Sequence, residues 1–171
     1  MNPEIEENSY TGLKISQYNS ENIYPLLPLL AEEFPNWTID KIKNYVKLVV
    51  TKKNEIAGML VAKNEALYNV GLLIYTFQSV GTKYLNNHEE HSNSKEEFTN
   101  GIVVENIIAS SPILKPQVFL IIVEHAMSIG KNNKCKFIEL PKFDETYRLI
   151  NEKYKNKIIK INNFRTAIKL D

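Results

Sequence analysis

Residues 102–140 constrain the fold of this chain more than any other stretch of its sequence. Residues 102–109 are rich in β-branched side chains, which favours a strand. Residues 115–129 carry apolar side chains at helical spacing and are followed by Gly130, which predicts a helix that ends there. Residues 136–140 are apolar again and predict a second strand. A helix between two strands predicts a parallel pair joined by a right-handed crossover.

The remaining elements can be placed by periodicity and by turn residues. Prolines 25 and 28 place the start of a first helix, and Pro35 ends it. Thr38 is a suitable N-cap for a second helix, whose apolar stripe is Ile39, Ile42, Val46 and Val49. Further strands are predicted at residues 13–18, 55–63, 68–78, 157–161 and 164–170, and a further helix at residues 144–153.

Two of these strand pairs are predicted to be hairpins. A short polar break separates strands 55–63 and 68–78, and Asn162-Asn163 offers a two-residue turn near the C-terminus. Strand 68–78 is apolar on both sides, as expected for a sheet covered on both faces. The element order β α α β β β α β α β β therefore predicts a mixed α+β fold.

Composition excludes several classes of protein. The chain has 171 residues, of which 43% are hydrophobic and 24% are charged, and these are globular values. We expect a flexible arm at residues 1–12 and a single domain at residues 13–171. A net charge of +1 gives no electrostatic footprint for nucleic acid or for an anionic membrane.

The N-terminus and the cysteine content favour a cytoplasmic protein. The first ten residues are acidic and lack the apolar core of a signal peptide, and no apolar run approaches the roughly 20 residues of a membrane span. Cys135 is the one cysteine, so no internal disulfide can form. It opens a predicted core strand, which indicates a buried, inert thiol.

Residues 81–101 form one long polar stretch that contains His88 and His91. Two histidines with Glu89 and Glu90 between them resemble part of a metal site, but no third or fourth ligand is evident nearby. A solvated loop is the favoured interpretation, and we expect no metal.

The element order resembles that of the GNAT superfamily, the acyl-CoA-dependent N-acetyltransferases. In that family the fourth strand ends in a small-residue turn with proline, and a loop patterned Arg/Gln-x-x-Gly-x-Gly/Ala opens the next helix. Residues 107–112, IIASSP, match the strand end and turn, and Lys115 stands at the start of the loop. The resemblance implies a mixed, mostly antiparallel sheet with helices on both faces and with strands 102–109 and 136–140 splayed apart.

The same resemblance implies acetyl-CoA, or another acyl-CoA, as co-substrate. The backbone of Ile107, Ile108 and Ala109 would line its pantetheine, with the N–H of Ile108 or Ala109 facing the oxyanion. Its pyrophosphate would meet Lys115 and the free N–H groups of Gln117, Val118 and Phe119. The chain departs from the family at Pro116, Val118 and Leu120, where the pattern has glycines. A non-catalytic GNAT-fold binding protein with a degenerate CoA site is therefore the alternative function.

Acetyl transfer to an amine needs a base, and Glu105 is the candidate. It stands among aliphatic residues of strand 102–109, so burial would strengthen it as a base. The alternative is a side chain that faces solvent or pairs with a lysine. Tyr147 is the candidate acid by resemblance; otherwise it packs or contacts substrate.

The acceptor is expected to be an amine on a small molecule or peptide. By resemblance, Trp37 lies in the region that shapes the acceptor pocket, although core packing explains it equally well. His125 shares the apolar face of helix 115–129 and is read as a core histidine. A homodimer is possible, because members of the family often pair through sheet edges.

Overall fold

A computed structural model describes residues 12–52, 56–81, 98–110, 112–141 and 144–170 of this chain. The strands are β1 (Lys14–Gln17), β2 (Ala57–Lys63), β3 (Asn69–Gly81), β4 (Phe98–Ala109), β5 (Phe137–Pro141), β6 (Ile158–Lys160) and β7 (Arg165–Lys169). The α-helices are α1 (Leu27–Glu33), α2 (Ile39–Lys52), α4 (Lys115–Asn132) and α5 (Arg148–Tyr154). Short 3-10 helices are η1 (Tyr24–Leu26), η2 (Glu145–Tyr147) and η3 (Lys155–Lys157).

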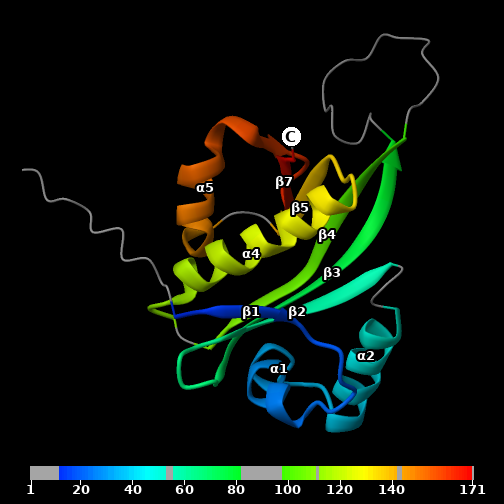
Figure 1. The fold of residues 1–171 in the computed structure, drawn as a ribbon, viewed down its shortest axis with the longest axis vertical. Coiled ribbons are helices and arrows are strands. Elements are labelled where there is room, and N and C mark those ends of the chain that lie inside the picture. The colour runs from blue at the N-terminus through cyan, green and yellow to red at the C-terminus, as the bar shows by residue number, and fades with distance from the viewer. Residues whose placement is uncertain (1–11, 53–55, 82–97, 111, 142–143, 171) are drawn as a thin grey trace, which may run out of the picture.

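The strands form one seven-stranded sheet in the order β1-β2-β3-β4-β5-β7-β6 (Figure 1). Neighbouring strands are antiparallel except β4 and β5, which are parallel and joined through α4. This arrangement confirms the predicted α+β class, the crossover and the two hairpins.

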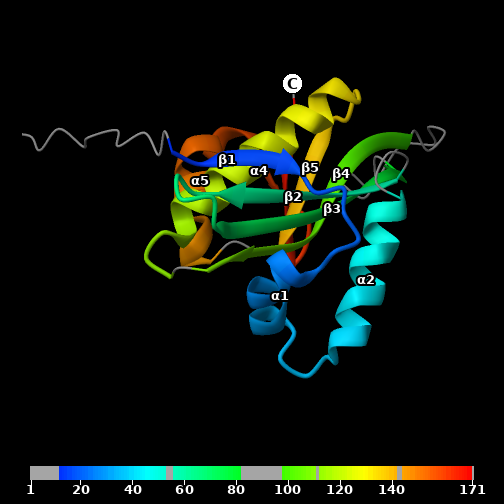
Figure 2. The ribbon, with the colours of Figure 1, turned by 60° about the horizontal axis from the view of Figure 1, so that its bottom comes forward.

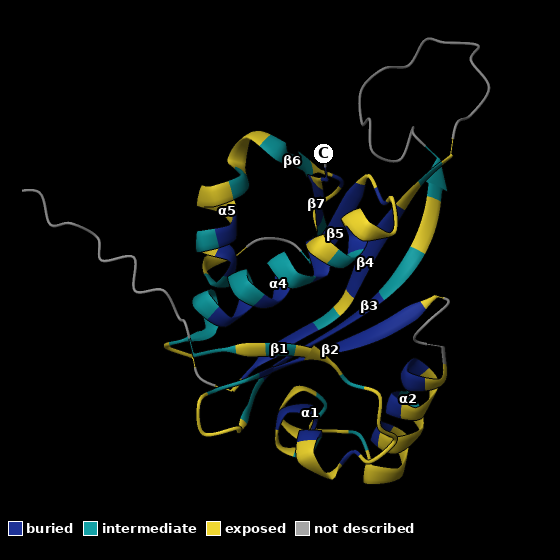
Figure 3. Ribbon diagram, viewed as in Figure 1, coloured by how far each residue is buried: buried dark blue, intermediate teal, exposed yellow. Residues whose placement is uncertain are grey.

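Helices cover both faces of the sheet, as predicted (Figures 1 and 2). Leu73 and Tyr75 of β3 lie in the core cluster that contains the buried face of α4. Leu72 and Ile74 lie in the cluster built with α1 and α2. Figure 3 shows buried residues along β2 and in the central parts of β3 and β4. The alternating side chains of a strand explain why both clusters draw on β3.

The strands β3 and β4 are longer than predicted. Strand β3 continues to Gly81 and β4 begins at Phe98, so pairing extends into the polar stretch from each side. Residues 82–97, which include His88 and His91, lie outside the described part of the chain.

Gly130 does not end α4 as predicted. The helix continues to Asn132, and Lys134 takes the left-handed φ of 59°. A Cβ on Gly130 would lie 2.9 Å from Cδ1 of Leu170, so the glycine permits close packing against the C-terminal strand. The reason for a glycine at this position is therefore its tertiary contact with Leu170, and not the end of the helix.

The C-terminal hairpin is present, but its turn is longer than the predicted Asn162-Asn163 pair. Strand β6 ends at Lys160 and β7 starts at Arg165. The Asn162 Oδ1 accepts hydrogen bonds from the backbone N–H groups of Phe164 and Arg165 at 2.7 and 2.9 Å. Asn162 therefore stabilises the turn through its side chain.

The apolar stripe of α2 is buried apart from its first member. Ile42, Val46 and Val49 are at most 7% exposed, whereas Ile39 is 54% exposed. Including Ile39 in the buried face was wrong, because it stands in the first turn of the helix, outside the core cluster on this face.

Replacing Thr38 with Ala is expected to destabilise the protein by about 1 kcal/mol. The Oγ1 of Thr38 accepts a hydrogen bond from the N–H of Lys41 at 3.3 Å and caps α2. Thermal unfolding should show a melting temperature lower by about 2–4 °C. Thr38→Ser keeps the acceptor and should melt close to wild type; equal losses for both variants would exclude a capping role.

Candidate functional site

The edge of β4 that faces β5 is paired over only part of its length. Among the residues that the structure describes, parallel pairing is limited to Gly101↔Phe137, Ile102↔Ile138 and Val103↔Glu139. Beyond Val103, β4 runs on to Ala109 while β5 pairs with β7 on its other side. At about 3.3 Å per residue this unpaired stretch is about 20 Å long. We call residues 104–109 the open edge of β4.

A β-bulge lies at the start of the open edge. Ile74 of β3 pairs with Asn106, but the next residue, Tyr75, pairs with Val104, so Glu105 is an extra residue on β4. Because of the bulge, Glu105 and Asn106 both turn toward the face covered by α1 and α2. Bulges often redirect side chains beside functional sites.

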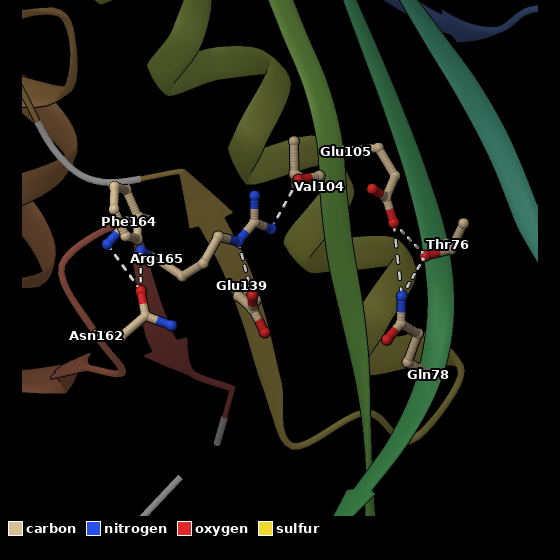
Figure 4. Close-up of polar contacts among 8 residues, drawn as sticks. All are labelled: Thr76, Gln78, Val104, Glu105, Glu139, Asn162, Phe164 and Arg165. Atoms are coloured by element: carbon tan, nitrogen blue, oxygen red, sulfur yellow. Dashed lines mark hydrogen bonds and ion pairs between the residues drawn. The ribbon is translucent and has the colours of Figure 1, made fainter. Parts of the chain in front are cut away.

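Glu105 is exposed, which agrees with the solvent-facing alternative and not with burial. Its Oε1 accepts a hydrogen bond from Oγ1 of Thr76 at 3.0 Å and is 3.5 Å from Nε2 of Gln78 (Figure 4). The aliphatic neighbours of Glu105 in the sequence gave no sign of the bulge that exposes it. The carboxylate is instead held by two neutral side chains of β3 at the solvent boundary.

Backbone groups along the open edge alternate in direction. The N–H of Ser110 donates to the carbonyl of Val70 on β3 at 3.0 Å. Alternation then directs the backbone of Ile108 toward β3 and that of Ile107 and Ala109 toward the open edge. Of the two N–H groups that the resemblance offered as oxyanion donors, that of Ile108 is therefore directed to β3, and only that of Ala109 faces the open edge.

The N-terminus of α4 lies where the open edge ends. Pro116 stands in the first turn, and the N–H of Val118 donates to the carbonyl of Leu114 at 3.0 Å. The expectation of a free N–H at Val118 is therefore wrong. Phe119 is likewise inside the helix, where its N–H bonds the preceding turn, so it too is not free.

Gln117 and Lys115 remain available at this helix start. In the described part of the chain, the N–H of Gln117 has no hydrogen-bond partner, and its Oε1 is buried without one. The ammonium of Lys115 lies 5.8 Å from the ring centroid of Phe119. An orphan amide oxygen beside a lysine suits a ligand that carries both N–H donors and negative charge.

Tyr147 is buried, with 4% of its surface exposed, and its ring centroid lies 5.3 Å from that of Phe119. Burial raises the pKa of Tyr147 far above the ordinary value. The negative charges of Asp144 and Glu33 raise this pKa further, and the positive charge of Arg165 lowers it. Tyr147 therefore lies within electrostatic range of charged side chains on both β7 and α1. A phenol with a raised pKa keeps its proton at neutral pH, where it can donate a hydrogen bond, but it is a weaker acid than an ordinary tyrosine.

Three aromatic side chains gather beside the bulge on the α1–α2 side. Phe34 and Trp37 stack with centroids 4.4 Å apart, and Tyr45 meets both rings edge-on. Asn106 Nδ2 donates to the hydroxyl oxygen of Tyr45 at 2.8 Å, which ties the cluster to β4. Burial raises the pKa of Tyr45, the Asn106 bond lowers it, and Glu105 raises it. Trp37 was singled out from sequence, but Phe34 and Tyr45 were missed.

Arg165 and Glu139 were also missed. The Nε of Arg165 lies 2.6 Å from Oε1 of Glu139, and its Nη2 donates to the carbonyl of Val104 at 2.8 Å (Figure 4). The sequence did contain a signal for this pair. Glu139 is a charged residue within the apolar strand 136–140, and a buried carboxylate needs a partner.

Other predicted features carry less chemistry. Cys135 is buried, as predicted, and burial raises the pKa of its thiol. His125 is half-buried on α4. Within the described ranges, no three His, Cys, Asp or Glu side chains are grouped to hold a metal ion. Over the same ranges, no helix has the length and apolar character to cross a membrane.

No protein-family model matches the sequence, and no curated protein matches it. Solved structures do. The chain is similar to an acetyltransferase of the GNAT family from Staphylococcus aureus Mu50, at 12% identity and a TM-score of 0.58, covering 93% of this chain and 99% of that one. It is also similar to an aminoglycoside 6'-N-acetyltransferase from Acinetobacter baumannii, at 14% identity and a TM-score of 0.57. The match covers 85% of this chain and 88% of that one.

A third similar structure is a chain of the NatC complex bound to Gag peptide and CoA, at 11% identity and a TM-score of 0.60, covering 94% of this chain and 99% of that one. Identities this low establish the fold and leave the substrate open. The chain has the GNAT fold, as the resemblance predicted.

Proposed function

We propose that this chain is an acyl-CoA-dependent N-acyltransferase, which transfers an acetyl group from the thioester directly to an amine. The observation that carries this proposal is the open edge of β4, which runs from the Glu105 bulge to the start of α4. An extended ligand with amide groups can pair with such an edge like an added strand. Its anionic end then meets a helix N-terminus, where the helix dipole favours negative charge.

The donors along this path fit an acyl-CoA. In the proposal, the backbone of Ile107 and Ala109 holds the pantetheine arm. Lys115 and the N–H of Gln117 hold the pyrophosphate, while Pro116 contributes no donor. Bound acyl-CoA supplies the thioester carbonyl, and the protein's contribution is to orient it beside Glu105.

Each step of the transfer has a residue assigned to it. Glu105 accepts a proton from the incoming ammonium, because only the neutral amine attacks. The N–H of Ala109 donates to the oxyanion that forms as the nitrogen bonds the carbonyl carbon. Tyr147 donates its proton to the sulfur as the carbon–sulfur bond breaks, and its phenolate takes up the second proton that the nitrogen loses as the amide forms. Carboxylates at Glu33 and Glu105 favour a cationic amine as acceptor.

Acetyl-CoA is expected to raise the melting temperature of the wild-type protein. At about 100 times Kd the ligand stabilises the fold by about 2.7 kcal/mol. For a chain of this size that corresponds to about 5–10 °C. Lys115→Gln should reduce the shift, whereas Lys43→Gln, on the exposed side of α2, should leave it unchanged. No shift at millimolar acetyl-CoA would refute the enzyme proposal.

A non-catalytic binding protein with the same fold is the second candidate. Pro116 and the paired N–H of Val118 favour it, because they leave few donors for a pyrophosphate. This candidate predicts no thermal shift with acetyl-CoA. It also predicts no release of free thiol from acetyl-CoA when cationic amines are added, which a thiol-reactive dye would measure.

A further inference from the structure

The side chain of Arg165 spans the place where β5 leaves β4. Its guanidinium lies 2.6 Å from the carboxylate of Glu139 on β5 and donates at 2.8 Å to the carbonyl of Val104 on β4 (Figure 4). The side chains of Arg165 and Glu139 are 22% and 6% exposed. This bridge joins three strands at the closed end of the open edge.

The carbonyl of Val104 needs this partner. Pairing with β5 stops at Val103, so β5 offers no donor to the next carbonyl on that edge of β4. Val104 is fully buried, and a buried carbonyl without a hydrogen bond is costly. Arg165 supplies the donor that the departing strand does not.

Glu139 fixes the guanidinium in place. A carboxylate in a strand that is buried at this point requires a charged partner, and the 2.6 Å contact is a charge-assisted hydrogen bond. The planar fork of an arginine can reach the carboxylate and the carbonyl together, whereas a lysine ammonium is a single point charge.

Val104 and Glu105 are consecutive, so the peptide group that Arg165 holds is the one from which the bulge begins. We propose that Arg165 is a positioning residue, which fixes the bulge through the Val104 carbonyl and thereby orients the Glu105 carboxylate. The catalytic part of this inference rests on the proposed function. Arg165 itself does not contact the reacting atoms.

The test compares E139Q with a chain carrying both E139Q and R165M. Removing Arg165 by itself would strand the buried charge of Glu139, so the neutral E139Q background avoids that cost. In E139Q the amide oxygen can still accept from Arg165, and the Val104 bond remains. R148M serves as a control, because Arg148 is an exposed arginine paired with Glu145 and Glu152.

We expect kcat of the double variant to be about 100-fold below that of E139Q, since displacement of a catalytic group by about 1 Å costs that much. The KM for acetyl-CoA should stay within about threefold, because ground-state binding is untouched. R165K in the wild-type background should keep only part of the wild-type kcat. A raised KM with unchanged kcat would overturn the proposal, because it would make Arg165 a binding residue.

Amide hydrogen exchange provides a readout that does not depend on activity. Loss of the Val104 bond should speed exchange at Glu105 and Asn106 by about tenfold relative to E139Q, and R148M should not. If wild type neither binds acetyl-CoA nor turns over, the proposed function fails, and exchange still decides whether Arg165 fixes the bulge. Unchanged exchange at both residues would overturn the inference.

Discussion

Replacing Glu105 with Gln is expected to lower kcat about 100-fold or more at neutral pH, which is the usual contribution of a general base. Gln is close in shape and can still accept the hydrogen bond from Thr76, so the geometry of the bulge should survive. Binding of acetyl-CoA, followed by calorimetry, should remain unchanged. The loss should shrink as pH rises toward the pKa of the acceptor amine, about 10 for a lysine-like amine, because solvent then removes the proton.

The matched control is Glu152→Gln, which removes an exposed carboxylate on α5 that pairs with Arg148. It should leave kcat and the pH profile at wild-type values. Equal activity of Glu105→Gln and wild type across the pH range would remove Glu105 from the mechanism. A fall in acetyl-CoA affinity in place of kcat would assign it to binding.

Replacing Gly101 with Ala is expected to destabilise the fold by about 1–3 kcal/mol, the usual cost of overpacking a core. A Cβ at this position would lie 2.0 Å from Cζ of Phe137, the residue paired with it across β4 and β5. Phe137 is 1% exposed and packs with Ile161 and Ala167, so its ring has little room to move. Urea unfolding measures the loss.

A double-mutant cycle separates this clash from the backbone effect of losing a glycine. Phe137→Ala should cost about 3–5 kcal/mol by leaving a cavity. In that background Gly101→Ala should cost little or nothing, since the ring it meets is gone. The same cost in both backgrounds would show that the ring contact is not the reason for a glycine at position 101.

Most of the fold could be predicted because its signals are local. The β-branched run of residues 102–109 and the helical spacing of residues 115–129 predicted the crossover, which the structure confirms. One prediction failed because of packing between distant segments. Local rules assigned Gly130 to a helix end, whereas in the structure the missing side chain of Gly130 leaves room for Leu170.

The candidate site was predicted in outline and changed in detail. Glu105 was singled out from its charge in an apolar strand, but the bulge exposes it. Ile108 and Ala109 could not be separated from sequence, because the direction of their N–H groups depends on which strand pairs with β4. The role of Glu105 in the reaction remains a prediction, which the Glu105→Gln kinetics will test.

The sequence by itself determined the element order, the two-sided sheet and the parallel crossover, since these follow from the periodicity of side chains along one segment. Only the tertiary structure decided where β4 and β5 part and what holds them there. Arg165 lies 26 residues from Glu139 and 61 from Val104, so no local pattern records that they meet. The sequence does show that Glu139, a charged residue in an apolar strand, needs a partner. The carbonyl of Val104 lacks a donor from β5 only because the two strands separate there, and this happens only once the sheet has formed.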